Sequence, residues 1–229
     1  MITAVIFDLD GTITDNEGDW EEVFRRVWEE YSGARWIEKK WLHVVGMGMV
    51  PNWRRLVKDE VIVQKLAART FELYKEKVAD RGEVRVREGM VEAVEKAREL
   101  GWLTALCTGS SWNTVEEELE QLGLYLAFDI TTTGEEVLAQ KPDPEIYILT
   151  AQKLGVDFRE CLVVEDSVSG VEAGAAAGME VAGLVTEYST ATVLRAAGAK
   201  YSLKDMKELA GLMVEIKSKE QVIDSGEEV

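Results

Sequence analysis

The chain of 229 residues carries 43 acidic and 26 basic side chains, a formal net charge of −17, and 46% of its residues are hydrophobic. This apolar fraction is enough for a folded core and excludes disorder along the whole chain. The negative charge disfavours nucleic acids and anionic membranes as partners, because both are polyanionic. No apolar run is long enough to cross a membrane, and an acid interrupts the first apolar stretch too early for a signal peptide. We therefore expect a soluble, cytoplasmic protein.

Five short apolar segments predict β-strands, and helical patterns separate the later ones. The segments cover residues 2–9, 103–107, 128–131, 161–165 and 180–185. Helical periodicity appears over residues 113–123, 144–155 and 168–178, and each of these stretches ends at a glycine that can cap a helix. This alternation predicts an α/β fold with a Rossmann-like, doubly wound parallel sheet. Such sheets bind their ligands at the carboxyl ends of the strands.

Residues 16–84 break the alternation, because their helical patterns have no convincing strand among them. The first pattern covers residues 20–31 and is amphipathic, with Asp19 as the expected N-cap. A shorter helix is expected within residues 36–45, and a long one over residues 53–78. The whole segment is therefore interpreted as an all-helical insert on the sheet.

This organisation predicts two domains and a tail. The α/β core comprises residues 1–15 and 85–216, and the inserted helical cap comprises residues 16–84. Five of the seven tryptophans lie in the cap, where we expect most of them to form the cap's own hydrophobic core. Residues 217–229 contain too few apolar side chains to pack, and we expect them to be a flexible tail.

Two aspartates follow the first predicted strand in the sequence FDLDGT. Asp8 and Asp10, at positions i and i+2, project toward the same side, and Gly11 allows the backbone to approach a bound group. Two neighbouring buried carboxylates repel each other strongly unless a divalent cation is present and one of them can carry a proton. An acidic turn before a helix is the alternative interpretation of this motif alone.

A second acidic pair, Glu165 and Asp166, stands at the end of the apolar segment 161–165. Oxygen ligands of this kind suit Mg²⁺, which keeps several waters and takes a few carboxylate or carbonyl oxygens. Asp8, Asp166 and the main-chain carbonyl of Asp10 would form such a set. Glu165 has two interpretations: it contacts the metal through a water, or it tunes the site without contact.

Thr108, Gly109 and Lys141 complete the polar set at the strand ends. A hydroxyl and free backbone N–H groups near a helix start suit a phosphate oxygen, although TGSS alone is more typical of a helix N-cap. Lys141, in QKPDPEIY, would alone be a solvated surface charge. The order of the four motifs and their places at strand ends favour chemistry instead. The single histidine, His43, excludes a histidine-rich metal centre and an ordinary Ser-His-Asp triad.

Taken in order, these motifs resemble those of the haloacid dehalogenase superfamily. The motif DxDGT is matched by residues 8–12, the Thr/Ser motif by Thr108, the lysine by Lys141 and the acidic motif by Glu165 and Asp166. The insert after the first motif is similar to the helical, C1-type cap of that superfamily. KPDPEIY and EDSVSGVEAGAAAGM resemble the branch of phosphoglycolate phosphatase and β-phosphoglucomutase, and the resemblance covers nearly the whole chain.

The resemblance implies a Mg²⁺-dependent phosphatase acting on a small phosphorylated metabolite. Asp8 would attack phosphorus to form an aspartyl-phosphate, and Asp10 would protonate the leaving alkoxide and later deprotonate the attacking water. The phosphoryl group would be bound by Gly11, Thr108, Gly109 and Lys141. The metal would be held by Asp8, Asp10 and Asp166. Glu165 would either contact it through a water or tune the site without contact.

Residue types separate the chemistries of the superfamily. Dehalogenases and phosphonatases lack the second aspartate of the first motif, which is present here as Asp10. The mutases carry a hinge histidine and a cap arginine, where this chain has Trp20 and Met49. A β-phosphoglucomutase-like phosphosugar mutase is the alternative within the superfamily. A catalytically silent phosphate-binding or regulatory protein is the alternative of another class.

The cap loop VVGMGMVPNW is rich in glycine and methionine and predicts a flexible, rather apolar lid. If the cap closes over the site, it excludes water and presents its own side chains to the leaving group. Substrate selectivity is therefore expected to depend on His43, Met47, Met49 and Arg54.

Overall fold

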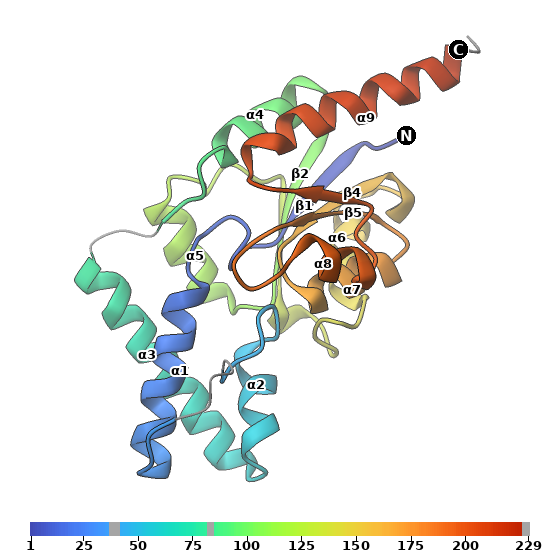
Figure 1. Ribbon diagram of the computed structural model, residues 1–229. Helices are drawn as coiled ribbons and strands as arrows, with labels where there is room; N and C mark the ends of the chain where they lie inside the picture. The colour runs from blue at the N-terminus through green and yellow to red at the C-terminus, as the bar shows by residue number, and fades with distance from the viewer. Residues whose placement is uncertain (37–41, 82–84, 226–229) are drawn as a thin grey trace.

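A six-stranded parallel sheet forms the centre of the molecule, which is a computed structural model that describes residues 1–36, 42–81 and 85–225 (Figure 1). The strand order is β3-β2-β1-β4-β5-β6. The strands are β1 (Ala4–Phe7), β2 (Leu103–Thr108), β3 (Ile130–Thr133), β4 (Cys161–Glu165), β5 (Glu180–Leu184) and β6 (Tyr201–Leu203). The first five confirm the sequence prediction. The sixth was missed because it has three residues, of which one is buried.

Alternating side chains of β1 enter two separate hydrophobic clusters, one on each face of the sheet. Val5 and Phe7 pack in the cluster that includes residues of three helices, α4 (Met90–Glu99), α5 (Trp112–Gln121) and α9 (Lys207–Ser225). Ala4 and Ile6 pack in the cluster that includes residues of α6 (Glu145–Leu154), α7 (Val168–Ala176) and α8 (Ala191–Ala197). Two short 3-10 helices, Gly134–Glu136 and Phe158–Glu160, precede α6 and β4. Helices on both faces confirm the doubly wound, Rossmann-like fold.

Three further helices lie together beyond the end of the sheet (Figure 1). They are α1 (Glu17–Ser32), α2 (Met49–Leu56) and α3 (Glu60–Arg81), and they share a third hydrophobic cluster. Helix α1 begins at Glu17, so the expectation that Asp19 caps it was wrong. Asn16 occupies the N-cap position without capping the helix, because its side chain bonds Gly11 and Asp10 instead.

The expected long helix over residues 53–78 is two helices. The break follows from Asp59, whose carboxylate accepts hydrogen bonds from the backbone N–H groups of Val61 and Ile62 and so starts α3. The short helix expected within residues 36–45 falls partly on residues 37–41, which lie outside the described residues.

The described residues of that stretch, Trp36 and Leu42 to Val45, are not helical. The reason is that its backbone N–H groups are bound elsewhere. Those of Leu42 and His43 donate to the Glu21 carboxylate, and that of Val44 donates to the side chain of Asn52.

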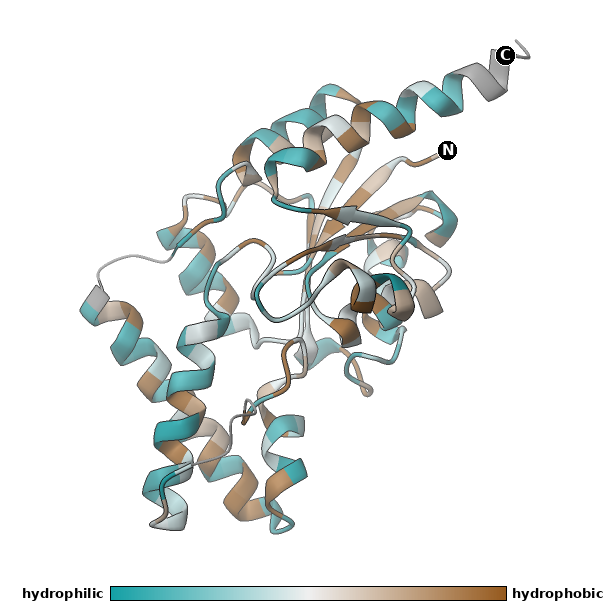
Figure 2. Ribbon diagram, viewed as in Figure 1, coloured by the Kyte–Doolittle hydropathy of each residue, from teal (hydrophilic) through white to brown (hydrophobic). Residues whose placement is uncertain are grey.

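Tryptophans contribute to the cluster of α1–α3, as predicted. Trp20 and Trp53 are buried in it, and Trp28 and Trp36 pack against it. Trp41 lies outside the described residues. The interior of the sheet is drawn in hydrophobic colours in Figure 2, while α9 alternates between hydrophobic and hydrophilic residues.

The prediction of a flexible tail from Lys217 needs correction. Helix α9 continues to Ser225, and its Glu220 accepts a hydrogen bond of 2.6 Å from the backbone N–H of Ile2 and pairs with the N-terminal ammonium. Residues 226–229 of the predicted tail are outside the described part. Within the described part of this segment, the Glu220 carboxylate thus attaches the helix to the start of the chain.

Candidate functional site

The polar residues of the four sequence motifs meet at the carboxyl ends of β1, β2 and β4. Asp8 follows β1, Thr108 ends β2 and Glu165 ends β4, and these neighbouring strands bring the side chains together. Asp166 and Lys141 join them from the adjoining loops. All five are almost completely buried, with 0 to 5% of their surface exposed. Buried charges of this density are costly unless they are paired or bind a ligand.

Lys141 is the cation of the cluster, which rules out a solvated surface charge. Its ammonium donates to Asp8 Oδ1 and to Glu165 Oε1, both at 2.6 Å, and more weakly to the carbonyl of Cys107 at 3.4 Å. It also lies over the ring of Tyr147, 5.0 Å from the centroid. The two carboxylates raise the pKa of Lys141 against the opposing effect of burial. Lys141 is therefore a fixed positive charge beside Asp8.

Asp8 is held in a setting that resists ionisation. Burial raises its pKa well above the usual range, Lys141 lowers it in part, and the nearby Glu165 raises it again. One lysine thus serves at least two buried carboxylates. Additional positive charge is needed if these acids are to be ionised together at neutral pH.

Asp166 carries the clearest sign of a ligand. Its Oδ1 accepts a hydrogen bond of 3.0 Å from the Thr12 hydroxyl, while its buried Oδ2 has no partner among the described residues. Burial, followed by repulsion from Glu17, raises the pKa of Asp166 well above the usual range. Oxygens of Asp8, Glu165 and Asp166 lie within 4.8 Å of one another. These oxygens fit a hard divalent cation, so the cluster can hold a metal.

Gly11 is required by this geometry. Its φ is +80°, and a Cβ there would lie 2.3 Å from Asp166 Oδ2. The sequence analysis predicted that Gly11 lets the backbone approach a bound group. In the structure the backbone at Gly11 passes directly beside Asp166 Oδ2, the carboxylate oxygen that has no partner among the described residues.

Glu165 is fully occupied by hydrogen bonds. Oε1 accepts from Lys141 and from the Tyr147 hydroxyl at 3.0 Å, and Oε2 accepts from the backbone N–H and the hydroxyl of Ser167 at 3.0 and 2.9 Å. Four donors use the capacity of a carboxylate. This arrangement favours the tuning role of Glu165, which positions Lys141, over contact with a metal through a water.

Asp10 is bound from both the sheet side and the helical insert. Oδ1 accepts from the Asn16 amide at 2.6 Å and from the indole N–H of Trp20 at 2.9 Å, and Oδ2 accepts from the Ser110 hydroxyl at 2.9 Å. Trp20 in turn stacks on Tyr74 with ring centroids 3.7 Å apart. Oδ1 thus accepts from two N–H donors, whereas Oδ2 accepts from one hydroxyl, which can itself rotate to act as an acceptor.

Sequence reasoning missed several of these partners, among them Ser110, Trp20 and Tyr147. Ser110 stands two residues after Thr108, and its backbone N–H donates to the Thr108 hydroxyl at 3.1 Å. Its place just after the end of β2 was the signal from which its contact with Asp10 could have been predicted. Trp20 was assigned to the hydrophobic core of the cap, and the period of α1 gives no sign of its bond to Asp10. Tyr147 lies in the predicted helix over residues 144–155, again without a local signal.

His43 is clamped between two carboxylates of α1. Its ring nitrogens lie 2.7 Å from Glu17 Oε2 and 3.1 Å from Glu21 Oε2. These acids raise the pKa of His43 to about 9 although burial lowers it, so the ring is an imidazolium at neutral pH. Glu21 also pairs with Arg25. His43 is thus a paired cation that fixes the cap loop to α1.

A cavity of about 690 Å³ lies over Asp8 and Asp10. It is lined by Thr108, Gly109 and Ser110 on the sheet side and by residues of the helical insert on the other. The structure places all four predicted selectivity residues in its wall: His43, Met47, Met49 and Arg54.

The cap loop contacts the sheet domain beside this cavity. The hydroxyl of Ser169 in α7 donates to the carbonyl of Val45 at 3.3 Å. Gly46, with φ of +74°, passes so close that a Cβ would lie 2.0 Å from the Ser167 hydroxyl. Ser167 also bonds Glu165. The loop therefore closes one side of the cavity through direct contact with the acidic cluster's neighbours.

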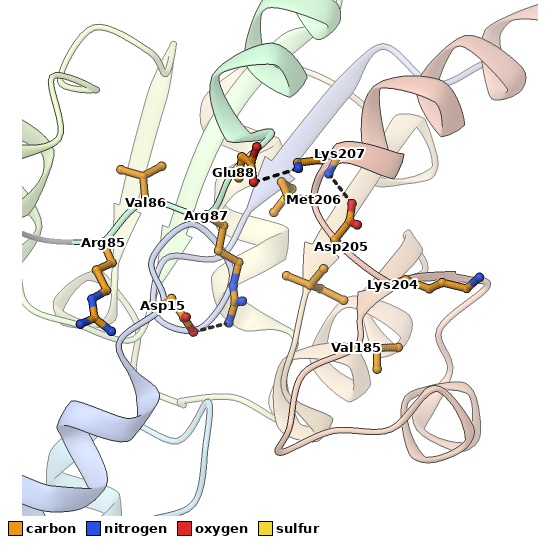
Figure 3. Close-up of a pocket in the computed structure, with 11 residues that line it drawn as sticks. Asp15, Arg85, Val86, Arg87, Glu88, Val185, Lys204, Asp205, Met206 and Lys207 are labelled. Atoms are coloured by element: carbon orange, nitrogen blue, oxygen red, sulfur yellow. Dashed lines mark hydrogen bonds and ion pairs between the residues drawn. The ribbon is translucent and has the colours of Figure 1, made fainter.

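A second cavity, of about 660 Å³, lies at the connection between the helical insert and the sheet. Arg87 joins the two connecting segments there, donating to the Gly11 carbonyl at 2.7 Å and to Asp15 at 2.9 Å. Figure 3 shows that Arg85 and Lys204 point away from each other. Other charged side chains of this cavity, Arg87 with Asp15 and Lys207 with Glu88, pair with each other (Figure 3). This cavity is therefore a weaker candidate for chemistry.

Comparison with known proteins agrees with the site. Residues 2–178 match the family model of the haloacid dehalogenase-like hydrolases. The chain is similar to the phosphorylated carbohydrates phosphatase of Thermotoga maritima, with 32% identity over 93% of this chain and 99% of the relative. It is also similar to the fructose-1-phosphate phosphatase YqaB of Escherichia coli, with 30% identity over 77% of this chain and 93% of the relative.

Among solved structures, a β-phosphoglucomutase from Clostridium difficile matches with a TM-score of 0.82 and 21% identity, covering 97% of this chain and 100% of that one. At this identity the match concerns the fold alone. Across the part of the chain that is described, no helix is both long and apolar enough to span a bilayer.

Proposed function

Because this chain belongs to the haloacid dehalogenase-like hydrolases and cleaves phosphate esters, we propose that it is a Mg²⁺-dependent phosphatase of a small phosphorylated metabolite. Its reaction would pass through an aspartyl-phosphate on Asp8. The observation that carries the proposal is the buried contact of Lys141 with Asp8, 2.6 Å long, beside Asp166 Oδ2, which has no hydrogen-bond partner in the described part of the chain. A nucleophile, a fixed cation and a free metal ligand thus share one strand-end site.

In this proposal Asp8 attacks phosphorus, and the P–O bond to the leaving alcohol breaks as the new acyl phosphate bond forms. Asp10 protonates the departing oxygen from Oδ2, the oxygen beside Ser110, and then takes a proton from the water that hydrolyses the acyl phosphate. Lys141, the Thr108 hydroxyl and the backbone N–H of Gly109 neutralise and orient the phosphoryl oxygens.

Asp8, Asp166 and the main-chain carbonyl of Asp10 would hold the Mg²⁺ in this scheme, with Glu165 acting through Lys141. The bound ion would supply positive charge to the phosphoryl oxygens and to the crowded carboxylates. Such an ion would favour the ionised forms of Asp8 and Asp166, whose pKa values burial raises.

The division of labour follows the predicted domains. We propose that residues 1–15 and 85–216 form the core that performs the chemistry, and that residues 16–84 form the cap that selects the substrate. Separate hydrophobic clusters in the two parts support this division. The contacts of Val45 and Gly46 with α7 support a cap that covers the site. We also propose that the protein is cytoplasmic.

Hydrolysis of p-nitrophenyl phosphate with and without Mg²⁺ tests the proposal. We expect release of nitrophenol that stops when the ion is chelated and returns when Mg²⁺ is added. Acid quench during turnover should trap a phosphoprotein that hydroxylamine cleaves, since hydroxylamine attacks acyl phosphates and leaves phosphoserine intact. Metal-independent hydrolysis, or a phosphoprotein stable to hydroxylamine, would contradict the scheme. If neither p-nitrophenyl phosphate nor any other phosphate ester were hydrolysed, the catalytically silent alternative would be supported instead.

A further inference from the structure

The wall of the catalytic cavity changes character from the sheet to the cap. On the sheet side it offers hydroxyl and amide groups, among them those of Thr108, Ser110 and Gln140. On the cap side its large side chains are mostly apolar: Trp20, Phe24, Met47, Met49, Val50 and Phe71. When phosphorus lies beside Asp8, the leaving group must face this second, apolar part.

The two cationic side chains described in the cap-side wall are already paired. His43 lies between Glu17 and Glu21, as given above. Arg54 donates to both oxygens of Glu60, at 3.0 and 2.7 Å, in a bidentate pair at the surface. A bound anion would have to compete with these carboxylates for either cation.

Carboxylates also face the cavity from three directions. Glu17 lines it from α1, Glu72 from α3 and Glu135 from the 3-10 helix after β3. Glu17 and Glu72 are themselves ion-paired, with His43 and Arg69. An anionic leaving group would therefore find no unpaired cation among the described wall residues and would meet the Glu135 carboxylate. Repulsion of this kind is an effective way to reject a competing ligand.

The start of α2 does not restore an anion site. Helix N-termini attract anions through their free backbone N–H groups. Here the first turn of α2 contains Pro51, which has no N–H to donate, and the flanking Met49 and Val50 present apolar side chains to the cavity.

We infer that the natural substrate is a phosphate monoester whose leaving group is uncharged and presents an apolar face to the cap. Neutral polyols, sugars with a hydrocarbon face and simple alcohols fit this class. Bisphosphates and phosphorylated carboxylic acids do not. The inference rests on the proposed function, because it takes the cavity over Asp8 as the place of the reaction, and it also disfavours a mutase cycle that needs a sugar bisphosphate.

Matched esters that share the scissile bond test the inference. One series compares 4-hydroxybutyl phosphate with butane-1,4-bisphosphate and 4-phosphooxybutyrate, and another compares benzyl phosphate with 4-carboxybenzyl phosphate. We expect kcat/KM with Mg²⁺ to fall by about 10-fold or more from each neutral ester to its charged partner. The leaving alcohols have similar pKa values within each series, so the ratio reports binding rather than chemistry.

Met49→Arg should reduce this preference by at least about 5-fold, since it places an unpaired cation in the apolar wall, and Met49→Leu should preserve it. Charged esters that react as well as neutral ones in the unmodified protein would overturn the inference and leave the proposed phosphatase intact. An unchanged ratio in Met49→Arg would show that Met49 does not contact the leaving group. It would also overturn the inference, which depends on the residues that line the cavity. Failure of all the esters to react would instead overturn the proposed function, and the inference with it.

Discussion

The sheet end and the cap wall of the catalytic cavity use charge in opposite ways. At the sheet end Asp8, Lys141, Glu165 and Asp166 are buried against one another, and one carboxylate oxygen has no partner among the described residues. In the cap wall the cations are already paired, and the surface left for a ligand is largely apolar. Charge at the sheet end is therefore left partly uncompensated by the described residues, whereas the cations described in the cap wall are paired.

The largest effect is expected at the sheet end from Asp8→Asn, which replaces the proposed nucleophile by an amide of nearly the same shape. We expect kcat to fall by at least about 10³-fold, because an amide does not form the acyl phosphate. Far-ultraviolet circular dichroism and thermal unfolding should show an intact fold. Retention of more than a few percent of the activity would remove Asp8 from the nucleophilic role.

His43→Gln tests the claim that the cap's charges serve structure. The pKa of His43 is raised from 6.5 to about 9 by Glu17 and Glu21, so the folded state favours the charged ring. The resulting stability is complete below pH 6.5 and is lost as the pH rises through about 9, a difference of about 3 kcal/mol. Urea unfolding across this range should show the decline in the unmodified protein and a flatter profile in the variant. If the free energy of unfolding changed with pH in the same way in both proteins, the claim that the pairs of His43 with Glu17 and Glu21 stabilise the fold would be contradicted.

Asp166→Ala addresses the unpartnered oxygen at the sheet end. We expect the Mg²⁺ concentration for half-maximal rate to rise by at least about 10-fold, since even the indirect partners of a metal contribute that much to its affinity. Mg²⁺ should also raise the Tm of the unmodified protein more than that of the variant. Asp80→Ala, at an exposed position of α3, is the matched control. An unchanged Mg²⁺ titration in Asp166→Ala would show that the ligand assignment is wrong.

Trp20→Phe has the smallest expected effect and sharpens the boundary between the two regions. It keeps a ring beside Tyr74 and removes the N–H donor to Asp10. We expect about a 5-fold loss of kcat for alkyl esters, which need a proton on the leaving oxygen, and less than about a 2-fold loss for p-nitrophenyl phosphate. Trp28→Phe, in the same helix, serves as the control. Equal losses for both kinds of ester would mean that Trp20 does not position the acid.

Sequence patterns predicted which side chains gather at the sheet end, because their positions are set by the ends of strands. A buried strand followed by acids fixes where Asp8 and Asp166 must lie, and the order of strands then brings Thr108 beside them. The burial of Lys141 was beyond local reasoning, since it depends on Glu165 and Tyr147, which join it only in the folded chain.

The helical insert was predicted less well, because long-range contacts override its periodicity. Asn16 binds Asp10 instead of capping α1, and Glu21 takes the backbone N–H groups that a helix over residues 36–45 would have used. The end of α9 shows the same effect, since Glu220 anchors it to the first residues of the chain. These errors trace to side-chain hydrogen bonds that periodicity does not reveal, and those of Glu21 and Glu220 join residues distant in sequence.

The central claim is that the sheet end supplies the chemistry for every substrate while the cap wall chooses among substrates. Its most direct test is kcat/KM for a panel of neutral esters, measured in Lys141→Ala and in Phe71→Ala. Lys141→Ala should lower all values by a common factor of about 10² to 10³, because the lost cation faces the shared phosphoryl group. Phe71→Ala, in the apolar wall, should change the ratio of benzyl phosphate to 4-hydroxybutyl phosphate by about 10-fold. Uniform scaling of the whole panel in both variants would contradict the account.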